Sequence, residues 1–301
     1  MLQKMKSSQF KINYQYREYH LKPIQIQHAA PAKPTDDIDI VDIFKIRKPD
    51  NILGLVLAFY ISFALSARKT ALIIKWVFGE KCSHQTVLNY AKATAHYAHR
   101  FNFKYKGPID NISVGDETYI KIGGEYNYVW FYLSAKTRRI TAYHLSDNRG
   151  TIPAVAATNE AIRTANKNQD ITIVTDGNPS YIEAIQFLNK DRAKEYKIKH
   201  IQVIGLQNNY NDNDETSESE EYRPFKQMIE RFNRSYKHHV KPAAGFNCYD
   251  GAMALTTLFV TYYNFLRPHG SLNYKPPIHI DQLDNIKTIQ AKWIKLISMM
   301  Y

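Results

Sequence analysis

Cysteine is scarce in this sequence. The 301 residues include only two cysteines, Cys82 and Cys248, and they stand far apart along the chain. Two isolated thiols cannot build a disulfide framework, and they cannot supply the ligands of a cysteine-rich zinc ribbon. The sequence therefore excludes both classes of small stapled domain, and it fits a reducing compartment.

Long hydrophobic runs are also missing. The longest run, from Ile52 to Leu65, has about 14 residues, whereas a membrane span needs roughly 20. The amino-terminal stretch MLQKMKSSQFKINYQ is basic but has no apolar centre, so it does not resemble a signal peptide. We therefore expect no transmembrane helix, no secretory leader and no membrane partner.

Acidic residues are fewer than basic ones. Lys and Arg total 40 and Asp and Glu total 28, which gives a formal net charge of +12. A basic excess of this size favours a polyanionic partner such as nucleic acid. The hydrophobic content of 44% and the length allow a buried core and two domains.

The first third of the chain has a helical pattern. Residues 1–50 are weakly patterned and are expected to form an arm or linker. Apolar spacing then predicts helices over residues 52–65, 67–78 and 84–101. Ser66 can cap the second of these helices and Gly79 can end it. We predict an all-α helix-turn-helix domain over residues 51–107, with a plain helical bundle as the alternative.

After Pro108 the pattern changes to that of strands alternating with helices. The expected strands are 112–122, 126–134, 140–145, 171–174 and 200–204, and the expected helices are 151–165, 179–188, 222–239 and 249–266. The order βββαβαβα is that of a ribonuclease-H-like α/β domain, which we place at residues 108–280, with a helical tail at 281–301. The acidic segment 208–221 is expected to be a mobile loop.

Three carboxylates stand out within this domain. Asp116 lies inside the first expected strand, Asp176 follows a short apolar strand, and Glu230 lies on a basic helix. Strand alternation sends Asp116 to one face of the sheet and its neighbour Glu117 to the other. Each acid alone could be an ordinary solvated residue. Together they have the ligand chemistry that holds Mg²⁺ or Mn²⁺ for attack on a phosphodiester.

Basic and amide side chains supply candidate DNA contacts. The third helix exposes residue types that read base edges in the major groove, and nearby cations could contact phosphates or simply be solvated. Lys237 follows Glu230 by seven residues, which places both on roughly one helix face. The candidate DNA-binding residues are Arg68, Lys69, Ser83, His84, Gln85, Thr86, Asn89, Arg234 and Lys237.

The motifs around these residues resemble those of a known family. They are VGDETYIKIGGEYNYVWFYLSAKTRRI around Asp116, VTDGNPSY around Asp176, IERFNRSYKHH around Glu230, and the tail YYNFLRPHGSLNYKPP. Over about residues 50–280 the sequence resembles the DDE transposases of bacterial and archaeal insertion sequences, close to their retroviral-integrase-like branch. The interval between the second acid and the Glu is longer than is usual in that family, and the acidic segment 208–221 can absorb the excess.

The resemblance implies a function and a set of roles. The expected function is that of a DNA transposase that binds element ends and catalyses strand cleavage and strand transfer. Asp116, Asp176 and Glu230 would bind two Mg²⁺ or Mn²⁺ ions, and Lys237 would complete the catalytic set by contacting DNA. The expected partners are double-stranded DNA, as element ends and target, and further copies of the chain in a homodimer or higher oligomer. The expected location is the cytoplasm, at the nucleoid.

Two other functions remain open. One is a domesticated DNA-binding protein that keeps the fold without catalysing a reaction. The three intact acids argue against it. The other is a nuclease of the same fold that only hydrolyses, although a helix-turn-helix favours a protein that must recognise ends. A serine hydrolase is unsupported, because Thr175 and Ser180 have no recognisable base partner in the sequence.

Overall fold

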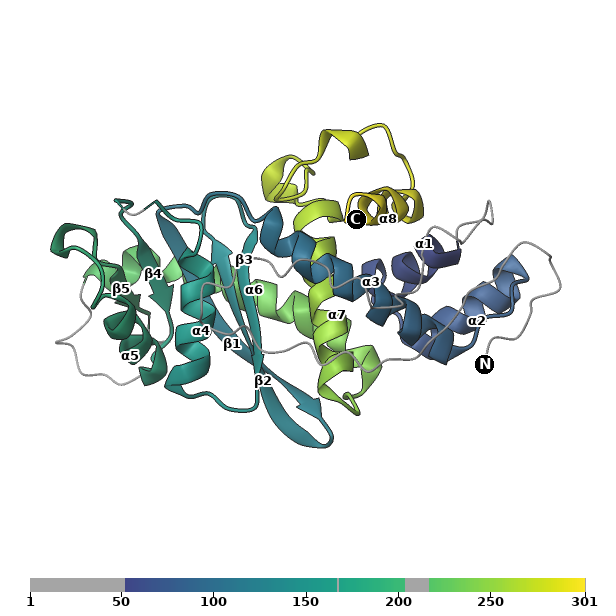
Figure 1. Cartoon of the computed structure of the whole chain (residues 1–301), viewed down its shortest axis with the longest axis horizontal. Helices are drawn as coiled ribbons and strands as arrows, with labels where there is room; N and C mark the ends of the chain where they lie inside the picture. Colours follow the sequence, from purple (N-terminus) through teal and green to yellow (C-terminus); the bar gives the residue numbers. More distant parts are fainter. Residues whose placement is uncertain (1–51, 167, 204–216, 301) are drawn as a thin grey trace, which may run out of the picture. The chain divides into compact units, whose positions relative to one another are not determined.

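The computed structural model describes residues 52–166, 168–203 and 217–300, and they form two compact units. Among these residues, the first unit comprises 52–104 and 238–300, and the second comprises 105–166, 168–203 and 217–237. The expected arm at residues 1–50 lies outside the described residues. The helices and strands of each unit are drawn in Figure 1.

The second unit is built on a mixed five-stranded sheet. Its strands are β1 (Ile112–Ile122), β2 (Glu125–Ser134), β3 (Ile140–Ser146), β4 (Thr172–Thr175) and β5 (Lys199–Gln202). The first three form an antiparallel meander, and β4 and β5 add in parallel on the free side of β1, giving the order β3-β2-β1-β4-β5. The predicted order βββαβαβα and the ribonuclease-H-like α/β fold are confirmed.

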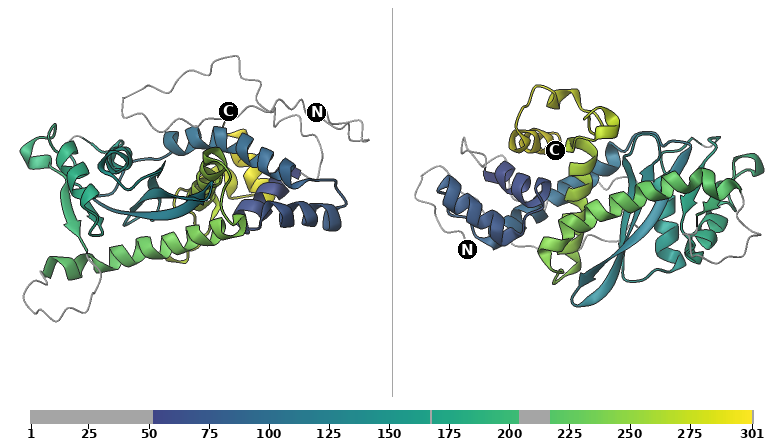
Figure 2. Two further views of the ribbon diagram at one scale, coloured as in Figure 1. Left: turned by 90° about the horizontal axis from the view of Figure 1, so that it is seen from below. Right: turned by 180° about the vertical axis from the view of Figure 1, so that it is seen from behind.

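Helices cover both faces of this sheet. They are α4 (Thr151–Ile162), α5 (Pro179–Leu188) and α6 (Ser217–Val240), with a short 3-10 turn, η3 (Lys194–Tyr196). Along β2, Trp130 contacts Tyr181 of α5 at 5.3 Å between ring centroids, while Phe131 contacts Phe232 of α6 at 4.8 Å. The two faces therefore alternate along the strand, as the pleat requires. The views in Figure 2 show α6 running along the side of the sheet away from α4.

One close contact fixes the strand that carries Asp116. A Cβ built on Gly115 would lie 2.6 Å from Cε1 of Tyr132, on the neighbouring strand β2. Tyr132 is fully buried, and its hydroxyl lies 2.5 Å from that of Thr158 in α4. Because the ring is held from both sides, only glycine fits at position 115.

The first unit is all-helical. It contains α1 (Ile52–Leu57), η2 (Ala58–Ser62), α2 (Ala67–Phe78), α3 (His84–Lys104), η4 (Lys241–Ala243), α7 (Tyr249–Thr261), η5 (Tyr262–Leu266), η6 (Gly270–Leu272), η7 (Asp281–Leu283) and α8 (Ile289–Ser298). Ser66 accepts a hydrogen bond from the Lys69 amide at 3.2 Å, and Gly79 ends α2 with a positive φ of 71°. Ser83 likewise accepts from the Thr86 amide at 3.0 Å. The predicted caps and the helix–turn–helix order are confirmed.

The division between the units differs from the expected boundary at residue 280. The buried side chain of Asn102 donates to the carbonyl of Thr257 at 3.3 Å and accepts from Thr261 at 3.0 Å. Phe101 packs edge-on against Phe265, with ring centroids 5.0 Å apart. These contacts join α7 to α3, so residues 238–280 pack with the helical unit. The sequence does not mark the division at residue 237, because α6 runs through it without a break.

Two segments differ in their local structure from the expectation. The first expected helix is divided, since α1 continues as a π-helix that ends at Ser62, and Ala64 has a positive φ of 53°. Residues 217–221 of the expected acidic loop are helical, and residues 208–216 lie outside the described residues. Glutamate favours helices and suits a first helical turn, which explains the earlier start of α6.

No helix in the described part of the chain combines the length and apolar composition that crossing a bilayer requires.

Replacing Gly115 by Ala tests the fit between β1 and β2. We expect the free energy of unfolding to fall by about 1–3 kcal/mol, because the added methyl group must displace the ring of Tyr132. Urea denaturation measures the change. Gly270→Ala is the control, because an added Cβ there meets nothing within 4 Å. Equal stability of the two variants would contradict the proposed contact.

Candidate active site

The sheet brings two of the three predicted acids together. β1 pairs with β4 only from Ile112 to Val114, so the edge of β1 is open beyond that point. Asp116 lies on this open stretch, and Asp176 follows the last residue of β4. One carboxylate oxygen from each of Asp116, Glu117 and Asp176 lies within 4.8 Å of the others. The acids therefore gather at the carboxyl end of a parallel strand, where α/β sheets place their ligands.

Burial, and after it the crowding of negative charge, raises the pKa of the two aspartates in this cluster. Burial, together with the charges of Glu117 and Asp176, raises the pKa of Asp116 to about 7, although the Lys226 ammonium opposes the shift. The pKa of Asp176 is also raised, again chiefly by burial. Two carboxylates that resist ionisation side by side would gain from a nearby cation.

Glu117 is already held by donors from the protein. Its Oε1 accepts from Arg149 Nε at 2.9 Å and from Asn178 Nδ2 at 3.2 Å, and its Oε2 accepts from Tyr181 Oη at 2.7 Å. The Glu117 side chain is only 2% exposed. A buried carboxylate needs this number of partners, so Glu117 acts as an anchor for the loop after β4 and for α5. No pattern in the sequence indicates these partners.

Asp116 is held from the opposite face, by α6. Asn233 Nδ2 donates to Asp116 Oδ2 at 2.8 Å, and the Glu117 amide donates to Asp116 Oδ1 at 3.1 Å. Asp116 and Glu117 thus point to opposite faces of β1, as strand alternation predicts. Lys226, one helical turn before Glu230, donates to the carbonyl of Val203 at 2.8 Å.

Asn233 was missed from the sequence. It is buried, and its Oδ1 has no hydrogen-bond partner among the described residues, although its Nδ2 donates to Asp116. The available signal was helical spacing, because Asn233 lies three residues after Glu230 and four before Lys237. All three therefore share one side of α6.

The structure does not bring Glu230 into the acidic cluster. Glu230 is exposed on α6, one turn before Asn233, and it is absent from the group formed by Asp116, Glu117 and Asp176. Arg234 and Lys237 are exposed as well. The ammonium of Lys237 lies 3.9 Å from the centroid of the Tyr119 ring.

The cluster has the donor set of a site for a hard divalent cation. Asp116 and Asp176 supply carboxylate oxygens, and the unpartnered Oδ1 of Asn233 is a third oxygen next to Asp116. Mg²⁺ and Mn²⁺ prefer such oxygen ligands. The residues therefore fit the expected cofactor, with Asn233 as an addition to the predicted set.

The predicted DNA-reading residues lie at the start of α3. Gln85 Nε2 donates to Asn89 Oδ1 at 2.9 Å, and the hydroxyls of Ser83 and Thr86 are 2.9 Å apart. Ser83 and Thr86 are thus engaged in the helix cap, while Gln85 and Asn89 form a pair. His84 is exposed, with Arg68 and Lys69 also exposed on α2.

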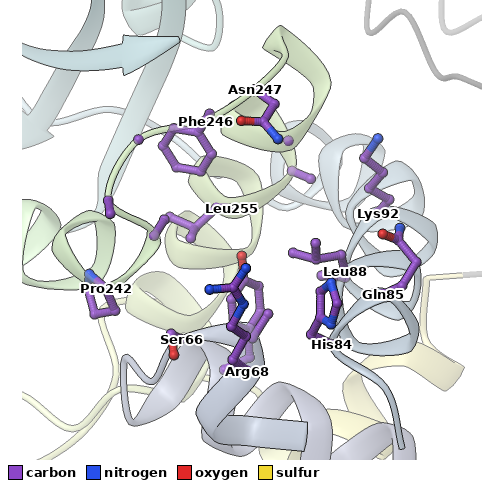
Figure 3. A pocket seen from close by; sticks show the side chains of 18 of the residues that line it. Ser66, Arg68, His84, Gln85, Leu88, Lys92, Pro242, Phe246, Asn247 and Leu255 are labelled. Atoms are coloured by element: carbon purple, nitrogen blue, oxygen red, sulfur yellow. The ribbon is translucent and has the colours of Figure 1, made fainter. Parts of the chain in front are cut away.

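Three of these residues face an open cleft of about 660 Å³ within the helical unit. Arg68, His84 and Gln85 form one side of it, and the loop that carries Phe246 and Asn247 forms the other. Figure 3 shows Arg68 and His84 extending into this space. The cleft therefore combines cationic, amide and aromatic side chains.

Comparison with known proteins identifies a region that includes most of the second unit and residues 238–277 of the first. Residues 112–246 match the family described as a DDE domain, and residues 216–277 match the integrase core domain. No curated protein matches the chain.

Similar solved structures include integrases and a transposase complex. The HTLV-2 integrase catalytic core domain in complex with magnesium, in its trimeric form, is 16% identical; the match covers 57% of this chain and 98% of that chain, with a TM-score of 0.39. The simian T-cell lymphotropic virus intasome in complex with PP2A regulatory subunit B56 gamma is 15% identical. That match covers 60% of this chain and 59% of the other, with a TM-score of 0.38. The Mos1 strand transfer complex is 11% identical; the match covers 92% of this chain and 79% of the other, with a TM-score of 0.31.

The sheet order, the acids at its open edge and the two domain matches define a polynucleotidyl transferase with a ribonuclease-H-like catalytic domain. Within that class the chain is a DDE-type transposase, as its motifs predict. Its general reaction is DNA cleavage and transfer of the transposase type.

Tyr181→Phe tests whether protein donors hold Glu117. We expect the free energy of unfolding to fall by about 1–3 kcal/mol, because a buried carboxylate loses a hydrogen bond. In a Glu117→Gln background the loss should be smaller, and a double-mutant cycle measures the difference. Tyr274→Phe, at an exposed tyrosine, is the control. The assignment fails if Tyr181→Phe is as stable as this control.

Proposed function

We propose that this transposase binds the ends of a DNA element with its helical unit and cuts and joins DNA strands at Asp116 and Asp176. The observation that supports this most is the convergence of these two carboxylates at the open edge of β1, inside the matched DDE domain. Double-stranded DNA, both element ends and target, is the proposed substrate. A complex of two or more copies at the nucleoid is the proposed working form.

Asp116 and Asp176 would hold Mg²⁺ or Mn²⁺, with Glu230 as the third predicted ligand. When bound, the cations would supply the positive charge that lowers the pKa of an attacking water or DNA 3′-hydroxyl and stabilises the leaving oxygen. Glu230 is exposed and shares a side of α6 with Asn233, so a change of its rotamer is the expected route towards the site.

The remaining residues orient the acids and the DNA. Asn233 fixes the carboxylate of Asp116, and Glu117 ties β1 to Arg149 and to α5. Lys226 places positive charge near both aspartates, which favours their ionised forms. Lys237 is the proposed phosphate contact, and two ions for each site are the proposed stoichiometry.

Two rival functions have distinct products. A nuclease of this fold would release cut DNA and form no joined product, and an inactive DNA-binding protein would form neither. The intact acidic pair favours a working enzyme over the inactive protein. Joining of a labelled element end to target DNA in Mn²⁺ separates a transposase from both rivals.

Asp116→Asn tests the metal site. The amide loses the charge that attracts the cation, so we expect cleavage and joining to fall about a thousandfold or more, with binding of DNA ends retained. Calorimetric titration with Mn²⁺ should show weaker binding, and titration of the unchanged chain gives the number of ions. Asp191→Asn, at an exposed aspartate, is the control. Undiminished joining by the Asp116 variant, or full activity in excess chelator, would refute the assignment.

Replacing Gln85 and Asn89 together by Ala tests DNA recognition by α3. We expect preference for the cognate end over scrambled DNA to fall, by about 1–3 kcal/mol for each side chain that reads a base. Since the two side chains bond to each other, the effects of the single substitutions should not add. Lys69→Ala is the comparison, because removing a phosphate-binding cation weakens binding to both DNAs alike. Competition binding measures the preference. If the double variant keeps it in full, α3 is not the reader.

A further inference from the structure

The β1–β2 hairpin carries exposed aromatic and basic side chains that have no role in the proposed function, and they lie beside Lys237, the proposed phosphate contact. We call this group the tyrosine hairpin, and it consists of Tyr119, Lys121, Tyr126 and the neighbouring Lys237 of α6. Both tyrosines are 54% exposed, and their rings meet edge to face with centroids 5.3 Å apart. Lys237 lies 3.9 Å from the ring centroid of Tyr119, and Lys121 lies 5.1 Å from that of Tyr126.

In the part of the chain that the structure describes, no third strand pairs with the tip of this hairpin to explain its aromatic residues. β4 pairs with β1 only as far as Val114, and β3 pairs with β2 only from Tyr128 onwards. The stretch from Tyr119 to Tyr126 is therefore a two-stranded ribbon. Neither tyrosine belongs to the buried core, so packing does not account for them.

Two elements connect the tyrosine hairpin to the acidic cluster. Along β1, Tyr119 is three residues beyond Asp116, which is about 10 Å at the usual rise of a strand. Along α6, Lys237 is one helical turn beyond Asn233, the residue that bonds to Asp116. The tyrosine hairpin is therefore a surface close to Asp116, on which DNA held at the acidic cluster can continue.

We propose that the tyrosine hairpin binds unpaired nucleotides of the DNA next to the reacting phosphodiester. A base would stack on Tyr119 or Tyr126, and Lys121 and Lys237 would contact the adjoining phosphates. Exposed aromatic rings flanked by cations are the features by which proteins hold single strands without reading their sequence. Paired bases within a duplex cannot offer their faces to a tyrosine, so the site requires an unpaired strand. This proposal rests on DNA as the substrate of the proposed function.

The lysine over Tyr119 does not block such binding. At an exposed site, a lysine–aromatic contact is weaker than the stacking of a base on a tyrosine. Lys237 would therefore exchange the ring for a phosphate when a base arrives. This movement would bring the Lys237 ammonium to a phosphate, which is the DNA contact predicted for it.

The test uses the full chain and DNA duplexes with or without a five-nucleotide unpaired tail, in chelator so that no turnover occurs. The tail carries 2-aminopurine, whose fluorescence reports stacking. We expect quenching when the unchanged chain binds the tailed duplex, and none when the probe lies inside a blunt duplex. Tyr119→Ala with Tyr126→Ala should weaken binding of tailed DNA about tenfold and abolish the quenching, with blunt duplex binding unchanged. The double Phe variant should behave like the unchanged chain.

Phe187→Ala is the matched control. Phe187 is a 52% exposed aromatic residue of the same unit, with Lys190 lying 5.6 Å from its ring centroid, and it lies on α5. It should change neither measurement. The proposal is overturned if the unchanged chain shows no quenching in the tail, a result that needs no variant and no assumption about folding. Equal weakening of tailed and blunt DNA by the double Ala variant would also overturn it, since that marks a duplex or phosphate surface.

Failure of this proposal can be told from failure of the proposed function. Cleavage and joining are measured separately, in Mn²⁺ and with the unchanged chain. Normal joining without fluorescence quenching in the tail overturns only the proposal for the tyrosine hairpin. Tail quenching without any cleavage overturns the proposed function and leaves the single-strand site standing.

Discussion

The burial of neighbouring carboxylates at the open edge of β1 is the constraint on which the catalytic unit depends. Asp116, Glu117 and Asp176 have oxygens within 4.8 Å of one another, and burial there raises the pKa of both aspartates. The chain compensates in two different ways. Glu117 receives Arg149, Asn178 and Tyr181, whereas Asp116 receives one side-chain amide and keeps a raised pKa of about 7. Because protein donors satisfy Glu117, it acts as a structural anchor. Because Asp116 has fewer such donors, its carboxylate is suited to binding a cation.

The sequence predicts the parts of this arrangement that follow from local rules. Strand alternation places Asp116 and Glu117 on opposite faces, and the caps at Ser66 and Gly79 follow from short-range hydrogen bonding and backbone freedom. Helical spacing places Glu230 and Lys237 on one side of α6. The sequence could not show that Asn233 reaches Asp116, because that contact joins residues more than a hundred positions apart.

The unit boundary was beyond sequence reasoning for a similar reason. Nothing in the composition near residue 237 changes, because α6 continues through it as a regular helix. Only buried contacts at long range, such as those of Asn102 with Thr257 and Thr261, assign α7 to the helical unit. Helical periodicity reports that a face is buried, but it does not report which partner buries it.

The shortness of β4 has a consequence for how this sheet could evolve. β4 pairs with β1 over only three residues, and the strand ends just before Asp176. Two more residues of parallel pairing would cover the edge of β1 as far as Asp116. The open edge that carries the acids would then become an ordinary interior part of the sheet. The length of β4 therefore determines whether substrate can reach Asp116. Insertions should be tolerated in the turn at Gly123 and Gly124. The end of β4, in contrast, can neither lengthen nor shift without the enzyme losing access to its substrate.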